Sequence, residues 1–107
     1  SSPALKRAAR HDGWIADLHS LAELEELVGA LEKCRVAEGT QSQPFRRFAF
    51  GCTDAVGASG YRSMFDMGID TVTLMPWLSY CGEINPPVVA KVDAIARFAD
   101  EVIADLR

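Results

Sequence analysis

Two long segments of the chain repeat hydrophobic residues at the spacing of an amphipathic helix. In the first, Ser20 and Glu23 form a capping box, and Gly39 supplies a C-terminal stop after the repeat. Its hydrophobic positions are Leu21, Leu24, Leu27, Val28 and Leu31. In the second, Asn85 is expected to cap and Pro86 to start a helix with one apolar stripe. The stripe consists of Val88, Val92, Ile95, Ala99, Val102 and Leu106, with Phe98 and Ile103 beside it.

Two shorter segments also predict helices. Ser2 is a candidate N-cap and Pro3 fits the first turn of a helix at the start of the chain. Its apolar face consists of Leu5, Ala8 and Ala9. Thr53 or Asp54 is expected to cap another helix, which Gly68 ends. The apolar positions of this helix are Tyr61, Met64 and Phe65.

Three segments between the helices predict strands, at residues 14–16, 45–52 and 69–78. The last mixes β-branched and apolar residues, with Val72 and Leu74 on one face and threonines on the other. Residues 79 to 85 are predicted to form a loop. The predicted order of elements is therefore αβαβαβα.

Strands that alternate with helices are typical of a parallel sheet, and the crossovers between parallel strands are nearly always right-handed. Every helix would then cover the same face of the sheet. The opposite face, with side chains such as Ile15, Phe48 or Val72, would have no cover within this sequence. A closed barrel turns such a face inward, so the order predicts part of a barrel that associates or is marginally stable.

Composition favours one small folded domain, because 107 residues are 49% hydrophobic and 24% charged. A formal charge of −4 and the short basic pairs Lys6-Arg7 and Arg46-Arg47 predict no nucleic-acid partner. No apolar run approaches the eighteen or so residues of a membrane helix, and the N-terminus lacks the apolar core of a secretory signal. The sequence therefore predicts no membrane contact and a cytoplasmic location.

Four stretches of the sequence together resemble one family of enzymes. They are PALKRAARHDGWIAD, LEELVGALEKCRVAEG, IDTVTLMPWL and KVDAIARFADEVIADLR. These stretches resemble the C-terminal part of the bacterial luciferase-like oxidoreductases, whose members are much longer than this chain. The family has a (β/α)8 TIM barrel, uses flavin mononucleotide (FMN) or a deazaflavin coenzyme, and carries out hydride transfer or oxygen-dependent monooxygenation.

The resemblance implies that residues 1–107 form a single incomplete domain with roughly the last three strands of a barrel and their flanking helices. In the family, a Gly-Gly pair normally ends the strand before the PALKRAA helix, and this chain begins at Ser1, just beyond that place. Most of the hydride-transfer machinery would lie elsewhere. The chain alone is therefore not expected to be an active enzyme.

In a TIM barrel, the chemistry lies in the loops after the carboxyl ends of the strands. Ser1 and Ser2 would stand at such a position, where helix N–H groups favour a phosphate, and the resemblance makes them candidate contacts of the cofactor. Trp77, directly after Pro76, is a candidate wall of a flavin or substrate pocket. The alternatives are that Ser2 is only a helix cap and that Trp77 is a core or rim aromatic.

Other residues with reactive side chains predict no catalytic or metal site. Asp17, His19 and Ser20 are neighbours in sequence, but a catalytic triad requires convergence in space, and Ser20 is better explained as a cap. Gly57 and Gly60 are not followed by the Lys-Ser/Thr of a phosphate loop and are expected to weaken their helix by about 1 kcal/mol each. The three cysteines, at spacings that fit neither zinc nor disulfides, are expected to be reduced thiols: Cys34, Cys52 and Cys81.

Two kinds of partner remain open at this point. The missing strands could come from another polypeptide, such as the N-terminal barrel portion, or from a second copy that completes a cofactor-binding barrel. Alternatively, the chain is a non-catalytic protein that self-associates through the bare face of its sheet. Only the assembled enzyme would retain a flavin.

Overall fold

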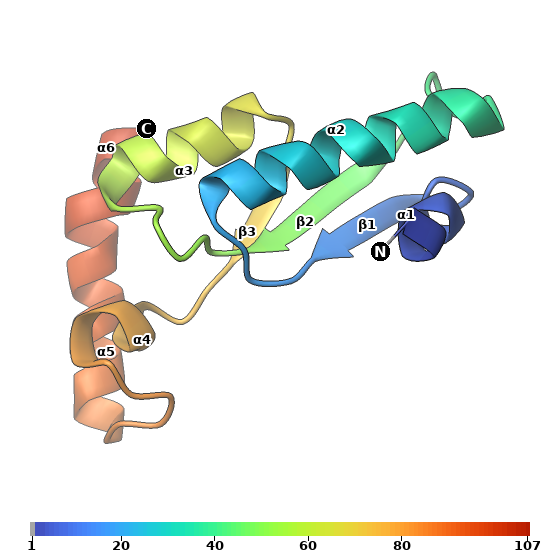
Figure 1. Cartoon of the computed structure of the whole chain (residues 1–107). Helices are drawn as coiled ribbons and strands as arrows, with labels where there is room; N and C mark the ends of the chain where they lie inside the picture. Colours follow the sequence, from blue (N-terminus) through green and yellow to red (C-terminus); the bar gives the residue numbers. More distant parts are fainter. Residues whose placement is uncertain (1) are drawn as a thin grey trace.

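A computed structural model describes residues 2–107 and shows an α/β fold with a parallel sheet of three strands in this range (Figure 1). The strands are β1 (Gly13–Ala16), β2 (Arg46–Phe50) and β3 (Thr71–Thr73). They lie side by side in the order β1, β2, β3 and run in the same direction. The predicted α/β class with parallel strands is therefore confirmed.

Helices cover one face of this sheet and stand at its two ends (Figure 1). The helices are α1 (Ser2–Ala8), α2 (Leu21–Glu38), α3 (Gly57–Asp66), α4 (Pro76–Cys81), α5 (Val88–Phe98), the π-helical turn η1 (Ala99–Ile103) and α6 (Ala104–Leu106). Figure 1 shows α2 and α3 above the sheet, α1 beside the beginning of β1, and α4 and α5 at the opposite end. The order of elements matches the prediction except for the additional short helix α4.

The ends of α2 follow the local signals that predicted them. The Ser20 hydroxyl accepts a hydrogen bond from the Glu23 backbone N–H at 3.2 Å, which satisfies one of the free donors of the first turn. Gly39 ends the helix in the left-handed region, at φ 75°, and its N–H donates to the carbonyl of Val36. Both predicted boundaries of this helix are confirmed.

Small residues in the strands let the helices pack closely on the covered face. Ala16 of β1 and Ala49 of β2 are buried beneath Leu24 and Val28 of α2, and Met64 of α3 joins the same cluster. Each buried aliphatic side chain contributes roughly 1.5 to 3 kcal/mol. The layer between the sheet and these two helices is therefore the hydrophobic core of the chain.

The opposite side of the sheet, here called the open face, is uncovered as predicted. Ile15 lies beside Phe48 in the register of the strands and is 70% exposed, and Phe50 is 43% exposed. The prediction that Val72 lies on this face was wrong, because Val72 pairs with Ala49, whose side chain points into the core. Thr71 pairs with Phe48 and takes the place expected for Val72.

The third strand is much shorter than the predicted residues 69–78. β3 ends at Thr73, and Pro76 starts α4, because proline cannot donate to a sheet ladder but fits the first turn of a helix. Residues 79 to 81, predicted as loop, form the end of this helix, which Gly82 terminates. The second strand is also shorter than predicted and ends at Phe50.

The C-terminal helix begins later than its sequence signals predicted. α5 starts at Val88 after the N-cap Pro87, so Asn85 does not cap it and Pro86 does not start it. The Asn85 side-chain oxygen instead accepts a hydrogen bond from Lys91 Nζ at 2.6 Å. Two consecutive prolines leave the chain extended here, since a residue that precedes proline avoids helical geometry.

The apolar stripe of this helix is split at the π-helical turn. The Ala104 N–H donates to the Ala99 carbonyl, a bond that spans one residue more than in an α-helix. The extra residue rotates the upstream stripe by about 100° relative to the downstream one. Val102 is therefore buried on the core, whereas Val92 and Ile95 are exposed, so the predicted apolar stripe does not lie against the core along its whole length.

The described chain is elongated, with extents of 48 × 27 × 22 Å and a radius of gyration of 15.6 Å. A compact domain of this length has a radius of gyration of about 13 Å. The difference reflects the uncovered sheet and the projecting α4 and α5. Among residues 2–107, no helix combines the length and apolar composition needed to cross a bilayer.

Candidate functional site

The loops after β1 and β2 are held together at the carboxyl end of the sheet. The Thr53 N–H donates to the His19 carbonyl at 3.0 Å. The Asp54 carboxylate accepts a hydrogen bond from the Leu21 N–H at 2.7 Å, so Asp54 helps to cap α2. The N-cap of α3 is Val56, without a side-chain hydrogen bond, and the predicted cap at Thr53 or Asp54 was wrong.

Side chains that resemble a triad in sequence have separate local roles. The Ser20 hydroxyl is engaged by the first turn of α2, and Asp17 accepts a hydrogen bond from the Leu18 N–H at 2.8 Å. His19 Nδ1 lies 3.3 Å from Glu23 Oε2, beside an open hollow of about 380 Å³. Within residues 2–107, no group of three or more His, Cys, Asp or Glu side chains is placed to hold a metal ion.

The Cys52 thiol and the Tyr61 hydroxyl, two uncharged hydrogen-bond donors, belong to buried residues near the carboxyl end of β2. Burial raises the pKa of the Cys52 thiol, and the nearby Asp54 charge raises it further. Burial also raises the pKa of Tyr61, with a smaller contribution from Cys52. The Tyr61 ring packs edge-on against Phe98 at 5.5 Å between centroids. Both groups therefore stay protonated near neutral pH.

We expect Cys52 to be the slowest of the three cysteines to react with iodoacetamide, because the thiolate is the nucleophile and both burial and a raised pKa deplete it. Cys81 is exposed and is expected to react first. Peptide mass spectrometry after timed alkylation near neutral pH measures the order. Reaction in denaturant is the control and should make the rates similar. Alkylation of native Cys52 as fast as Cys81 would contradict the burial.

The serines predicted to contact a cofactor phosphate lie at the start of the chain. Ser1 is outside the described residues. Ser2 is the first residue of α1 rather than the residue before it, so its predicted role as an N-cap was wrong. Figure 1 shows α1 and α4, which carries Trp77, at opposite ends of the molecule. The structure therefore does not bring Ser2 and Trp77 together.

Trp77 lies inside α4 rather than directly at the end of a strand. Its indole N–H donates to the Ile84 carbonyl at 2.8 Å, and Lys91 Nζ stands 5.3 Å from the ring centroid. The single donor of the indole is thus satisfied within the chain. The ring remains half-buried, and a role as a pocket wall stays a prediction.

A second aromatic and cation pair, which the sequence pattern did not predict, also joins α4 to α5. Arg97 stacks over the Tyr80 ring at 4.2 Å and donates to Glu101 at 2.8 Å, while the Tyr80 hydroxyl donates to Glu101 at 3.0 Å. These hydrogen bonds, from Arg97 first and Tyr80 second, lower the pKa of Glu101. The four-residue spacing of Arg97 and Glu101 could have predicted this ion pair from the sequence, because residues four apart are neighbours on a helix surface.

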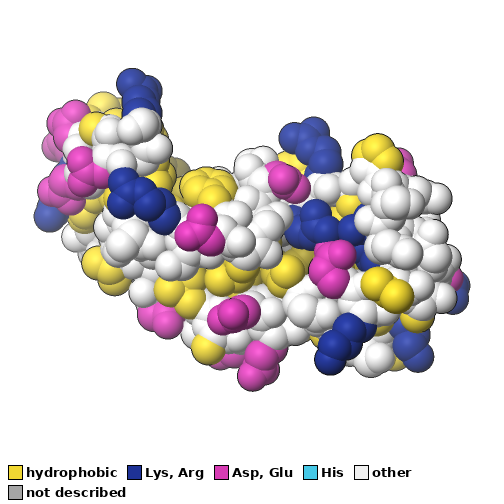
Figure 2. Space-filling model, turned by 90° about the horizontal axis from the view of Figure 1, so that it is seen from above, with side chains coloured by type: hydrophobic (Ala, Val, Ile, Leu, Met, Phe, Trp, Pro, Cys, Tyr) yellow, Lys and Arg dark blue, Asp and Glu magenta, His cyan; other side chains and the backbone are white. Residues whose placement is uncertain are grey.

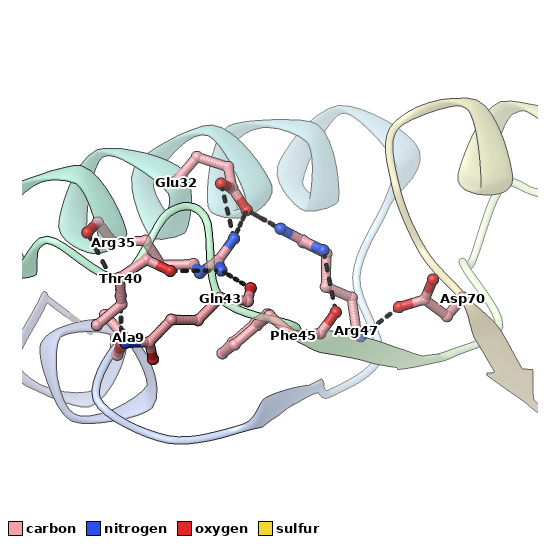
Figure 3. Close-up of polar contacts among 8 residues, drawn as sticks. All are labelled: Ala9, Glu32, Arg35, Thr40, Gln43, Phe45, Arg47 and Asp70. Atoms are coloured by element: carbon pink, nitrogen blue, oxygen red, sulfur yellow. Dashed lines mark hydrogen bonds and ion pairs between the residues drawn. The ribbon is translucent and has the colours of Figure 1, made fainter.

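A polar network ties together the opposite, amino end of the sheet (Figure 3). Arg35 of α2 is 3% exposed and donates to Glu32 at 3.2 Å and to the carbonyls of Thr40 and Gln43 at 2.9 and 2.8 Å. Its guanidinium also lies 4.5 Å from the Phe45 centroid. Arg35 therefore links α2 to the turn that leads into β2.

The same network continues to β3 and α1 through shared partners. Arg47 pairs with Glu32, and its backbone N–H donates to the Asp70 carboxylate at 2.7 Å. The Thr40 hydroxyl donates to the Ala9 carbonyl at 2.8 Å. Apart from the Arg35–Glu32 pair within α2, these contacts join different segments of the chain, so the network is explained by a structural role.

Charges on the helical side of the molecule are mixed in sign. Figure 2 shows basic and acidic side chains interspersed on this side, with hydrophobic side chains between them. The chain also forms surface ion pairs, such as Arg10 with Glu38 at 3.3 Å. Exposed pairs of this kind contribute little to stability. Their arrangement gives no single-sign surface on this side.

The chain is similar to longer mycobacterial proteins. Uncharacterized proteins of Mycobacterium bovis and of two Mycobacterium tuberculosis strains are each 30% identical to it over 102 residues. The match covers 94% of this chain and 35% of each relative, so the chain spans about a third of the length of the curated relatives it matches. No protein-family profile and no solved structure matches the chain.

Proposed function

We propose that this chain is the C-terminal portion of a luciferase-like oxidoreductase that uses FMN or a deazaflavin coenzyme. Its sheet would supply roughly the last three strands of a (β/α)8 barrel. The observation that carries the proposal is the parallel sheet with helices on one face and apolar side chains on the other. A barrel turns such a face inward, where layers of side chains fill it.

The extent of the similarity to the relatives is in line with this proposal. Three strands are three-eighths of an eight-stranded barrel, and the match covers 35% of each relative. The Arg35 network also lies at the amino end of the strands, where TIM barrels place residues that serve stability. In such a barrel, the loops that carry the chemistry follow the carboxyl ends of the strands, at the opposite end from the Arg35 network.

The residues present fit a flavin only in part. Trp77 offers an aromatic wall, but its N–H is already satisfied by Ile84. α1, with Ser2 at its start, lies at the other end of the molecule (Figure 1). Ser2 and Trp77 therefore do not converge on one coenzyme in this chain, and the expectation that the chain alone is inactive stays a prediction. When bound in an intact barrel, the coenzyme would supply the hydride or activate oxygen.

A chimera tests the proposal. The matched segment of the Mycobacterium tuberculosis relative is replaced by this chain, and bound coenzyme is measured by absorbance and native mass spectrometry. We expect the chimera and the unmodified relative to bind FMN or a deazaflavin, and Trp77→Ala to weaken binding in the chimera. A folded chimera and a folded relative that bind neither coenzyme would overturn the proposal.

A second candidate is a non-catalytic protein that self-associates. The exposed side chains of the open face and the unpaired edges of the sheet favour it. Native mass spectrometry of the isolated chain separates the two candidates. A defined oligomer without coenzyme, together with a chimera that binds none, would support the second candidate.

A further inference from the structure

The last residues of the open face, at the carboxyl ends of the strands, form one row across the sheet. Phe50 of β2 pairs with Thr73 of β3. On the other side of Phe50 stands Asp17, which directly follows β1, because the residues before them, Ala16 and Ala49, pair with each other. The two alanines are buried in the core, so Asp17 and Phe50 point to the open face. The three exposed residues Asp17, Phe50 and Thr73 are here called the carboxyl-end row.

The carboxyl-end row places one aromatic ring between two polar groups. Phe50 is 43% exposed, whereas Phe48, the other ring on this face of β2, is half-buried and lies under the Arg46 guanidinium at 5.1 Å. Neighbouring strands are about 4.8 Å apart, so a ring stacked on Phe50 has a hydroxyl on one side and a carboxylate on the other. A carboxylate only accepts hydrogen bonds. The row therefore fits an apolar ring that carries a hydrogen-bond donor.

The loops beside the carboxyl-end row contain two carboxylates and no lysine or arginine. These loops, which follow the three strands, are residues 17–20, 51–56 and 74–75. The carboxylates belong to Asp17 and Asp54, and the His19 ring of the same loops lies 3.3 Å from Glu23. Two like charges about 4 Å apart in water repel enough to change an affinity about fivefold. An anionic ligand is therefore disfavoured at this row.

Basic side chains of the neighbouring elements are distant or engaged. Arg46 precedes Phe50 by four residues, which is about 13 Å along a strand, and it borders a hollow with Asp12 at the amino end of the sheet. On α5, Lys91 and Arg97 each donate a hydrogen bond to another side chain of the chain. The charge next to the row is thus set by Asp17.

We infer that the carboxyl-end row is the floor of the substrate pocket and selects an uncharged compound with an apolar ring and a hydroxyl group against a carboxylate. Its role as a pocket floor rests on the proposed function, because only a closed barrel turns the open face into the inside of a pocket. Residues at the carboxyl ends of barrel strands line the site. Phe50 holds the ring, and Asp17 accepts a hydrogen bond from the hydroxyl group.

Benzyl alcohol and benzoate are matched probes, because they share one ring and differ in charge. The isotope-labelled full chain is titrated with each probe near neutral pH, and backbone amide shifts are followed by NMR. We expect benzyl alcohol to shift the amides of Asp17, Phe50 and Thr73, and benzoate to bind about fivefold more weakly. Asp17→Asn should bring the two affinities together, because it removes the repelling charge.

Replacement of Phe50 by alanine tests the contact with the ring. Phe50→Ala should weaken the binding of both probes about threefold or more, because it removes the stacking partner. Phe65→Ala on α3 is the matched control, because Phe65 is 42% exposed and Phe50 is 43% exposed. This control should leave both affinities unchanged. Circular dichroism establishes that each variant is folded.

The outcomes separate this inference from the proposed function, because the full chain is titrated without coenzyme. Equal binding of the two probes to the wild-type chain overturns the selection against a carboxylate. Absence of shifts at the carboxyl-end row overturns the pocket floor, and so do equal effects of Phe50→Ala and Phe65→Ala. The expected shifts, together with a folded chimera that binds no coenzyme, support the ring site and contradict the proposed function.

Discussion

Replacement of Arg35 by alanine is expected to lower the free energy of unfolding by about 3 kcal/mol or more. The guanidinium is buried and donates to Glu32 and to the carbonyls of Thr40 and Gln43. Alanine would leave both carbonyls without this donor and would open a cavity beside Phe45. Small domains are stable by only 5 to 15 kcal/mol or so, which makes this loss large.

Urea denaturation followed by circular dichroism measures the effect of Arg35→Ala. Lys33→Ala is the matched control, because Lys33 is exposed on the same helix and should change stability by no more than about 0.5 kcal/mol. Glu32→Gln should cost less than Arg35→Ala, since Glu32 is partly exposed. An Arg35→Ala chain as stable as the control would show that the network contributes little.

Two helical glycines are expected to respond in opposite ways to alanine. A Cβ at Gly60 of α3 would stand 2.7 Å from the Ala55 Cα, a backbone atom that cannot move freely. We expect Gly60→Ala to destabilise the chain by about 1 to 3 kcal/mol through overpacking. A Cβ at Gly29 of α2 would meet nothing within 4 Å, so Gly29→Ala should stabilise the chain by about 1 kcal/mol.

The same urea experiment compares Gly60→Ala and Gly29→Ala, and each serves as the other's control. Helix propensity alone predicts a gain at both positions, whereas close packing predicts a loss at Gly60 only. Equal stabilisation by the two substitutions would refute the close approach of α3 to the loop before it. The result also decides whether the close approach of Ala55 explains the presence of Gly60 in α3, although glycine lowers the stability of a helix.

Elements with strong local signals could be predicted from the sequence. Ser20 and Gly39 bound α2 as expected, because caps depend on residues a few positions apart. The alternation of helices and strands gave the parallel sheet and its uncovered face. β3 was predicted too long because apolar residues continue to Leu78, although Pro76 ends any strand pairing.

Features that depend on distant contacts could not be read from local patterns. Asp54 has the form of a cap for the next helix, but its carboxylate accepts a hydrogen bond from the backbone N–H of Leu21, 33 residues away in sequence. The π-helical turn leaves no mark in a stripe that looks continuous from Val88 to Leu106. Val72 was assigned to the wrong face because strand register is set by pairing with Ala49.

The candidate site was predictable only as a set of loop positions. His19 and Asp54 follow the strands predicted at residues 14–16 and 45–52, and the two loops do meet through the Thr53 N–H and the His19 carbonyl. The coenzyme contacts at Ser1, Ser2 and Trp77 came from the family resemblance and stay predictions. Tyr80 and Arg97 were missed as a pair because one lies in a segment taken for a loop.

The attachment of α5 to α4 has a consequence for the dynamics of the chain. α5 packs mainly against α4, and Trp77 and Tyr80 of α4 contact Lys91 and Arg97 of α5 largely at the surface. Amide protons of α5 can therefore exchange with solvent through a local opening that leaves the sheet intact. Amides of α2 beside Arg35 require a larger opening. We therefore expect two levels of protection against amide hydrogen exchange in this chain, a lower one in α5 and a higher one in α2 beside Arg35.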